Sequence, residues 1–200
     1  AYHADAAGER RGGLIILQEI FGITGHIRRV CDDYARHGYE VIAPALFDRM
    51  EPGVELAYDA EGTTRGKEMA VSLRWEAPLL DIAAAAAHLR TSGCDRLAVV
   101  GYCWGGSLAW LAAQRLDGID AVVCYYGGQV AQFLSDKAKC PVMLHFGRED
   151  AFIPMEDVDE IRAALPGTDV FLYPAGHGFN CDERGGFHQA SADLALERSL

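Results

Sequence analysis

The fold of this chain is decided by one stretch of sequence, Arg96-Leu97-Ala98-Val99-Val100-Gly101-Tyr102-Cys103-Trp104-Gly105-Gly106. Its apolar half is typical of a buried strand, and it leads into a Gly-x-Cys-x-Gly motif centred on Cys103. This is the pattern of a nucleophile elbow, in which a strand turns sharply into a helix and presents one reactive side chain. Gly101 and Gly105 fit such a turn because a Cβ would obstruct it. A glycine-rich turn around a structural cysteine explains the motif equally well, so the rest of the chain has to decide.

Length and composition favour one ordinary domain. The chain has 200 residues, 50% of them hydrophobic, which suits a single domain over residues 1–200. A formal net charge of −11 argues against nucleic acid and anionic membrane surfaces as partners, because both attract basic faces. The apolar runs are too short for a transmembrane helix, which needs about 18 residues. The first residues have neither the basic nor the apolar region of a signal peptide and include no Met, so we expect a slight truncation at one or both ends.

The six cysteines do not require a disulfide framework in a chain of this length. Cys31 and Cys124 lie among apolar residues, as small buried hydrophobic side chains would. Reduced thiols are typical of the cytoplasm, so the sequence predicts a cytoplasmic protein.

Short apolar runs alternate with segments of helical spacing along the chain. The strand-like runs cover residues 14–18, 40–43, 97–100, 121–125, 142–146 and 170–173, and the helical segments cover 27–34, 80–89, 105–116, 155–165 and 188–200. Near-continuous apolar strands alternating with helices predict an α/β fold with a mostly parallel central sheet and helices on both faces. Residues 48–66 carry much charge and glycine and are interpreted as an excursion over the sheet edge.

Candidate site residues follow the strand-like runs, where ligands of parallel sheets bind. Cys103, Asp150 and His177 come in the order nucleophile, acid, histidine, which is the chain order of the α/β-hydrolase fold. His177 alone among the histidines follows a strand in a glycine-flanked loop. Asp150 competes with its neighbour Glu149 for the acid role and could instead cap the segment that follows it. Glu19 follows the first of these runs, where it is either a partly buried site group or a solvated loop carboxylate.

Four motifs together resemble the dienelactone hydrolase (carboxymethylenebutenolidase) family, and the resemblance covers nearly the whole chain. They are Gln18-Glu19-Ile20-Phe21-Gly22, Gly101-Tyr102-Cys103-Trp104-Gly105-Gly106, Phe146-Gly147-Arg148-Glu149-Asp150 and His177-Gly178-Phe179. The resemblance implies an α/β-hydrolase fold with Cys103, Asp150 and His177 as the catalytic triad. It further implies that Glu19 holds the resting thiol, and that the backbone N–H groups of Ile20 and Trp104 form the oxyanion hole.

The same resemblance suggests substrate-binding residues. Family members bind a substrate carboxylate with two arginines, one in the excursion and one four residues after the histidine. Arg65 could fill the first role, but the second position is Cys181 in this chain, and Arg184 lies one turn further on. Three aromatic residues within the motifs, Phe21, Tyr102 and Phe179, are expected to complete the substrate-binding set.

The sequence therefore predicts a cysteine-dependent hydrolase that cleaves a small ester or enol-lactone through a thioester acyl-enzyme, with a place in aromatic degradation. No metal or cofactor is expected, because the Cys and His residues show no ligand spacing. The partner would be the small-molecule substrate, and the protein a monomer or small homo-oligomer. Two alternatives are a broader carboxylesterase or thioesterase of the same fold and a non-enzymatic, redox-responsive protein that uses Cys103 as an oxidisable thiol.

Overall fold

A seven-stranded sheet forms the centre of the computed structural model, which describes residues 1–200. The strand order is β1-β3-β2-β4-β5-β6-β7, and only β1 is antiparallel to its neighbour. The strands are β1 (Tyr2–Ala4), β2 (Gly12–Leu17), β3 (Tyr39–Ala43), β4 (Leu97–Tyr102), β5 (Ala121–Tyr125), β6 (Val142–Gly147) and β7 (Asp169–Tyr173). The helices are α1 (Gly25–Arg36), α2 (Ala60–Ser72), α3 (Glu76–Thr91), α4 (Trp104–Arg115), α5 (Met155–Ala164) and α6 (Gln189–Ser199).

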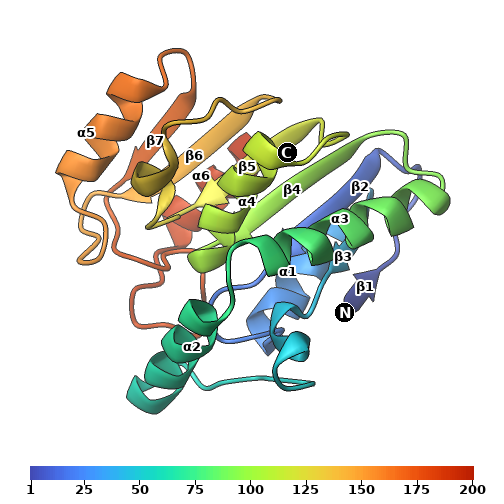
Figure 1. The fold of residues 1–200 in the computed structure, drawn as a ribbon, viewed down its shortest axis with the longest axis horizontal. Coiled ribbons are helices and arrows are strands. Elements are labelled where there is room, and N and C mark those ends of the chain that lie inside the picture. The colour runs from blue at the N-terminus through green and yellow to red at the C-terminus, as the bar shows by residue number, and fades with distance from the viewer.

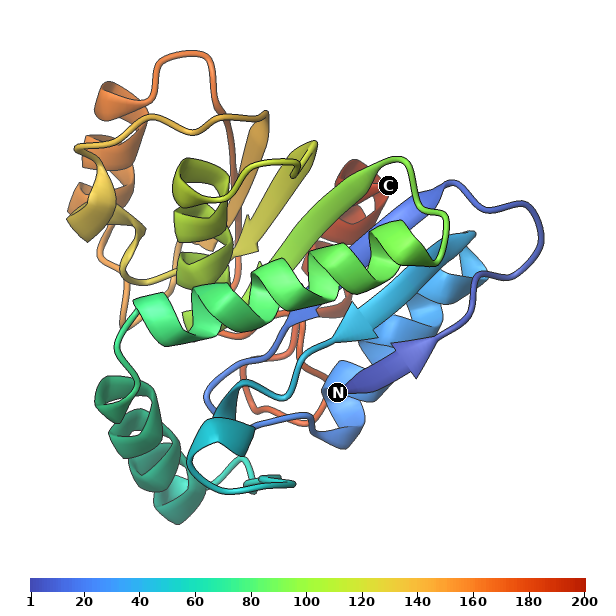
Figure 2. The ribbon, with the colours of Figure 1, turned by 45° about the vertical axis from the view of Figure 1, so that its right-hand side comes forward.

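Helices cover both faces of this sheet. In Figures 1 and 2, α3 and α4 lie on one face, and α1 and α6 lie on the other. All six residues of β2 are buried, because a central parallel strand has covered neighbours on either side and helices above and below. A single hydrophobic core of 51 buried residues joins the sheet to the helices on its two faces. The α/β-hydrolase fold class that the sequence predicts is confirmed.

The N-terminal edge of the sheet adds one strand that the sequence analysis does not include. Tyr2–Ala4 pairs antiparallel with β3, and three residues are too few to show a strand pattern. The prediction for β5, in contrast, matches the observed Ala121–Tyr125 at both ends.

The excursion over residues 48–66 lies at the carboxyl ends of the strands. Glu55 forms an isolated antiparallel bridge with Gly22, directly after β2. The segment then enters α2, which lies apart from the helical layers in Figure 1 and packs against the loop after β2. A Cβ on Gly66 would lie 2.1 Å from the carbonyl oxygen of Ile20, so only glycine permits this approach. The excursion therefore forms a wall beside the strand ends.

None of the helices combines the length and apolar character that crossing a bilayer requires.

Candidate active site

The elbow brings Cys103 to the carboxyl end of the central strand β4. Cys103 has φ +57° and ψ −118°, and α4 starts at the next residue. A Cβ on Gly101 would lie 1.9 Å from the Gly105 carbonyl oxygen, and a Cβ on Gly105 would lie 2.4 Å from that of Gln18. Both glycines are therefore required by close approach of strand, turn and helix. The strained conformation holds the thiol out of the turn, half-buried at the strand end.

Three strand ends bring the predicted triad together. His177 Nε2 lies 3.1 Å from Cys103 Sγ, and His177 Nδ1 lies 2.8 Å from Asp150 Oδ2. Asp150 is buried, and its other oxygen Oδ1 accepts hydrogen bonds from the backbone N–H groups of Phe152 and Ile153. The carboxylate thus caps its own loop and orients the imidazole at once. The neighbouring Glu149 is exposed and takes no part.

The charge state of His177 follows from its neighbours. Burial by itself lowers the pKa of His177, but the Cys103 thiolate and the Asp150 carboxylate outweigh burial and raise this pKa to about 10. The imidazole is therefore protonated at neutral pH when it faces a thiolate. An imidazolium 3.1 Å from sulfur is the arrangement that stabilises a thiolate nucleophile.

Glu19 is buried beside this triad and is paired with a cation. Its Oε1 accepts a hydrogen bond from Arg184 Nη1 at 3.1 Å, while Oε2 has no partner in the chain. The family resemblance implies that Glu19 holds the resting thiol, but in this structure the thiol contacts His177. Arg184 reaches Glu19 across Gly178, whose φ is +74° and where a Cβ would lie 2.7 Å from Arg184 Nη1.

The two expected oxyanion donors come from the elbow and from the loop after β2. Ile20 follows Glu19 in the loop after β2, and its N–H donates to no carbonyl of the chain. Trp104 is the first residue of α4, where an N–H has no acceptor within its own helix. Neither N–H therefore has a backbone acceptor, and the role of both as oxyanion donors stays a prediction.

Four of the expected substrate-binding residues lie differently from the prediction. Phe21, Tyr102 and Phe179 are each at most 1% exposed, so their rings belong to the core below the site. Tyr102 stacks on the Tyr125 ring at 4.7 Å, because alternation along β4 turns it into the interior. Arg65 is exposed and forms a 2.6 Å ion pair with Glu51, so its charge already has a partner.

Two further side chains lie on this side of the triad: one packs against His177, and the second lies over the ring of the first. Phe152, which is 62% exposed, places its ring edge on the His177 ring at a centroid distance of 5.2 Å. Lys67 of α2 holds its Nζ 5.3 Å from the centre of the Phe152 ring and has no carboxylate partner. The position of Phe152, two residues after the acid, was the available clue. Lys67 could be found only from the structure, because the rotation of α2 decides which of its side chains faces Phe152.

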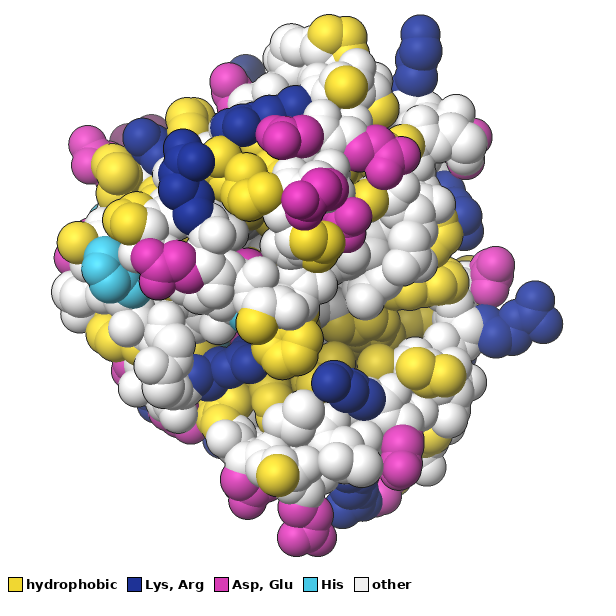
Figure 3. Space-filling view, turned by 90° about the vertical axis from the view of Figure 1, so that its left-hand side faces the viewer, with side chains coloured by type: hydrophobic (Ala, Val, Ile, Leu, Met, Phe, Trp, Pro, Cys, Tyr) yellow, Lys and Arg dark blue, Asp and Glu magenta, His cyan; other side chains and the backbone are white.

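Figure 3 shows a hollow on the side of the molecule that carries α2 and α5 in Figure 1. Its floor is hydrophobic, and Lys or Arg side chains lie at its rim. Such a shape suits a small, mostly apolar substrate with an anionic group.

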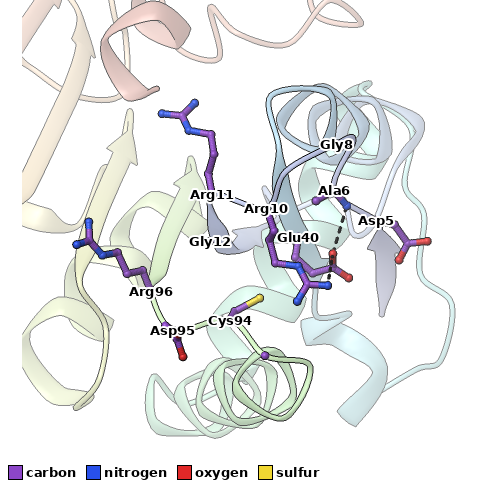
Figure 4. Close-up of a pocket in the computed structure, with 11 residues that line it drawn as sticks. Asp5, Ala6, Gly8, Arg10, Arg11, Gly12, Glu40, Cys94, Asp95 and Arg96 are labelled. Atoms are coloured by element: carbon purple, nitrogen blue, oxygen red, sulfur yellow. Dashed lines mark hydrogen bonds and ion pairs between the residues drawn. The ribbon is translucent and has the colours of Figure 1, made fainter.

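A polar cavity of about 590 Å³ lies elsewhere. Figure 4 shows it between the amino ends of β2 and β4, with Arg10, Arg11, Arg96 and Glu40 around it. Glu40 is occupied there, because it accepts a hydrogen bond from the Ala6 N–H and faces Arg10. This polar cavity lies at the amino ends of the strands, whereas Cys103 lies at a carboxyl end, so the cavity contributes nothing to the triad.

Two clusters could in principle hold a metal ion, His26–Cys181–Asp182 and His3–Asp5–Glu40. In the first, Asp182 is already paired with Arg29 at 2.8 Å. In the second, His3 contacts its two carboxylates through opposite ring nitrogens, which a single ion cannot replace. Neither cluster contains a residue of the triad.

Comparison with known proteins agrees with the fold and the motifs. The sequence profile of the dienelactone hydrolase family matches residues 1–200. The carboxymethylenebutenolidase of Pseudomonas putida is 33% identical over 200 residues, spanning 94% of this chain and 83% of that protein. A candidate carboxymethylenebutenolidase from Synechocystis sp. is 34% identical over 199 residues, spanning 90% of this chain and 80% of that protein.

Solved structures give the same result. A candidate dienelactone hydrolase from Klebsiella pneumoniae has a TM-score of 0.84 at 30% identity, covering 97% of this chain and 87% of that chain. An α/β serine hydrolase homologue from Coxiella burnetii has a TM-score of 0.71 at 13% identity, over 99% of this chain and 89% of its own, and so shares the fold. The elbow, the order of the three strand-end residues and these matches have one common explanation: this chain is a hydrolase of the dienelactone hydrolase family.

Proposed function

We propose that this protein is a cysteine-dependent hydrolase that cleaves a small ester or enol-lactone of the dienelactone type through a thioester intermediate. The observation that carries the proposal is the continuous contact from Asp150 to His177 to Cys103, at 2.8 Å and 3.1 Å. Such a chain of contacts activates a thiol and orients the base that later activates water.

In the first half of the reaction, the Cys103 thiolate attacks the carbonyl carbon and forms a C–S bond. The carbonyl electron pair moves to oxygen, where the Ile20 and Trp104 N–H groups stabilise the negative charge. The tetrahedral intermediate collapses, the C–O bond of the ester or ring breaks, and an enolate leaves. His177 gives its proton to that leaving oxygen. Because an enolate is a stabilised leaving group, a thiolate is a sufficient nucleophile for this step.

In the second half, neutral His177 takes a proton from water as the water oxygen attacks the thioester carbonyl. Collapse of the second intermediate breaks the C–S bond and releases the carboxylic acid. The sulfur leaves as a thiolate beside the reprotonated imidazole, which restores the starting state. Asp150 accepts a hydrogen bond from His177 Nδ1 throughout and keeps Nε2 directed at the reacting atoms.

We also propose that the substrate carries a negative charge, which Lys67 receives at the rim of the site. Lys67 stands over Phe152 and has no ion pair, whereas Arg65 is paired with Glu51 and Arg184 with Glu19. On a chain with a formal charge of −11, an anion needs such a local cation to approach. A broad esterase would instead prefer uncharged esters, so substrate charge separates the two activities.

All six cysteines are free, which supports the proposal that the protein functions in a reducing compartment such as the cytoplasm.

The deciding experiment combines a panel of lactones and chromogenic esters with titration of Cys103 by a thiol reagent. We expect hydrolysis of the activated substrates and complete loss of activity when one equivalent has modified Cys103, as located by peptide mass spectrometry. Full activity after complete labelling of Cys103 would rule out the covalent mechanism. Hydrolysis of none of the panel would favour the redox-responsive alternative.

A further inference from the structure

Tyr126 has a backbone conformation that few tyrosines adopt. It follows β5 directly and has φ +39°, and the only other non-glycine residue with positive φ is Cys103. The Cys103 N–H donates to the Tyr125 carbonyl at 2.9 Å, so the two strained residues are neighbours on adjacent strand ends. A plain turn at this position would favour glycine, and Gly127 is the next residue. The chain instead has a tyrosine here, and the strained backbone sets the direction of its side chain.

That side chain lies inside the site. The Tyr126 ring is fully buried, with its centre 5.1 Å from that of His177 and 5.3 Å from that of Phe179. Its hydroxyl has no hydrogen-bond partner in the chain. Buried phenol groups are normally hydrogen-bonded, because losing water without a replacement is unfavourable. The Tyr126 hydroxyl is therefore a donor that lacks an acceptor.

Glu19 offers the complementary acceptor. Its Oε1 is bound by Arg184, and its Oε2 is fully buried without a partner in the chain. Burial raises the pKa of Tyr126 well above its usual value, and the charge of the nearby Glu19 raises it further. The phenol therefore stays protonated and able to donate. Two buried groups, one donor and one acceptor, are thus unpaired, and the charges of both Glu19 and Cys103 act on Tyr126.

We propose that Tyr126 is a positioning residue of this site, whose hydroxyl supplies the missing hydrogen bond to Glu19 Oε2 through one buried water molecule. A site with polar groups on two sides suits such a water. This hydrogen bond would keep Oε2 turned away from the Cys103 thiol and weaken the effect of its charge on the thiolate. The inference rests on the proposed function only in assuming that Glu19 acts on Cys103.

The test measures the second-order rate of iodoacetamide alkylation of Cys103 at pH 7, located by peptide mass spectrometry, and needs no turnover. Tyr126→Phe keeps the ring against His177 and Phe179 and removes only the hydroxyl. Because Arg184 still binds Oε1 of Glu19, the freed Oε2 can accept a hydrogen bond from the thiol. We expect alkylation to slow about three- to ten-fold. Glu19→Gln should speed it, because a negative charge near the thiol is removed.

A double-mutant cycle separates positioning from packing. In the Glu19→Gln background, Tyr126→Phe should leave the rate within about two-fold, because the group it acts through is gone. Tyr125→Phe is the matched control: its hydroxyl already bonds Ser199 at 2.8 Å, and its loss should not change the rate. Equal effects of Tyr126→Phe in both backgrounds, or none in the wild type, would overturn the proposal. A chain inactive on every ester but showing this coupling would contradict only the proposed function.

Discussion

His177 Nε2 lies 3.1 Å from Cys103 Sγ, and in the proposed mechanism the two residues act as a pair. We therefore expect Cys103→Ala and His177→Ala each to lower kcat/KM for an activated lactone by at least about 10³-fold. The double variant should lose little more than either single one, because each substitution disables the whole unit. Steady-state kinetics on purified variants with unchanged circular dichroism tests this. More than a few per cent of activity left in Cys103→Ala would contradict covalent catalysis.

The proposed role of Lys67 in binding an anionic substrate can be tested with Arg65 as a matched control. Lys67→Ala should lower kcat/KM for a carboxylated lactone about five- to ten-fold and leave a neutral ester nearly unchanged, since only the anion loses a charge-assisted contact. Arg65→Ala removes a cation two residues away on the same helix, but that charge is already paired with Glu51. It should have no such effect. Equal losses on both substrates for Lys67→Ala would leave Lys67 with a packing role only.

At the residue level, a sequence can select site candidates where chemistry and chain order agree, but not where geometry alone decides. Cys103, Asp150 and His177 could be selected because each follows an apolar run at the same sheet edge. Tyr126 could not, because nothing in Tyr-Tyr-Gly-Gly shows which residue adopts positive φ. The choice between Arg65 and Lys67 depends on the rotation of a helix with weak hydrophobic patterning.

At the scale of elements, the elbow depends on contact between helix α4 and strand β2. A methyl group on Gly105 would lie 2.4 Å and 2.5 Å from the carbonyl oxygens of Gln18 and Leu17. Gly105→Ala should therefore destabilise the fold by about 1–3 kcal/mol and displace the nucleophile. Gly128→Ala is the control, because its nearest neighbour atom would be an ordinary 3.7 Å away. Urea unfolding and hydrolysis rates measure both effects, and equal stability of the two variants would contradict this account.

Six of the seven strands and most helices could be predicted because their periodicity is strong and their faces are buried. The helix α2 within the excursion was missed, since Gly62 and Gly66 both disfavour a helix locally. Those glycines are explained only by tertiary contact: a Cβ at either would lie within 2.1 Å of a backbone oxygen. A single sequence does not show such contacts, so the wall beside the site is seen only in the structure.

At the scale of the whole molecule, His145 links the sheet to the C-terminal helix. It is buried in β6, contacts the Tyr173 hydroxyl at 2.7 Å and lies 3.3 Å from Ser199 of α6. Burial lowers the pKa of His145 to about 3, and the positive charge of Arg198 lowers it further. The folded state therefore keeps this group neutral where the unfolded chain, with a histidine pKa of about 6.5, binds a proton.

Stability should consequently fall as the pH falls from about 6.5 towards 3, by about 1.4 kcal/mol per pH unit for this one group. His145→Gln does not titrate, so its unfolding free energy should depend on pH with a shallower slope in that window. Urea unfolding of both proteins between pH 7 and pH 4 gives the difference between their unfolding free energies at each pH. The carboxylates are the same in both proteins, so their contribution cancels in this difference. Parallel slopes would show that His145 is not the titrating group.

The Glu19–Arg184 ion pair joins residues 165 positions apart in the chain. The other strand-end groups come from segments between them, so the complete site forms only when nearly the whole sheet has been assembled. Long-range pairing of this kind forms late during folding. Until then the Cys103 thiol is an ordinary cysteine with no imidazole beside it. We therefore expect selective alkylation of Cys103 to recover only late in refolding, after the strand ends have come together.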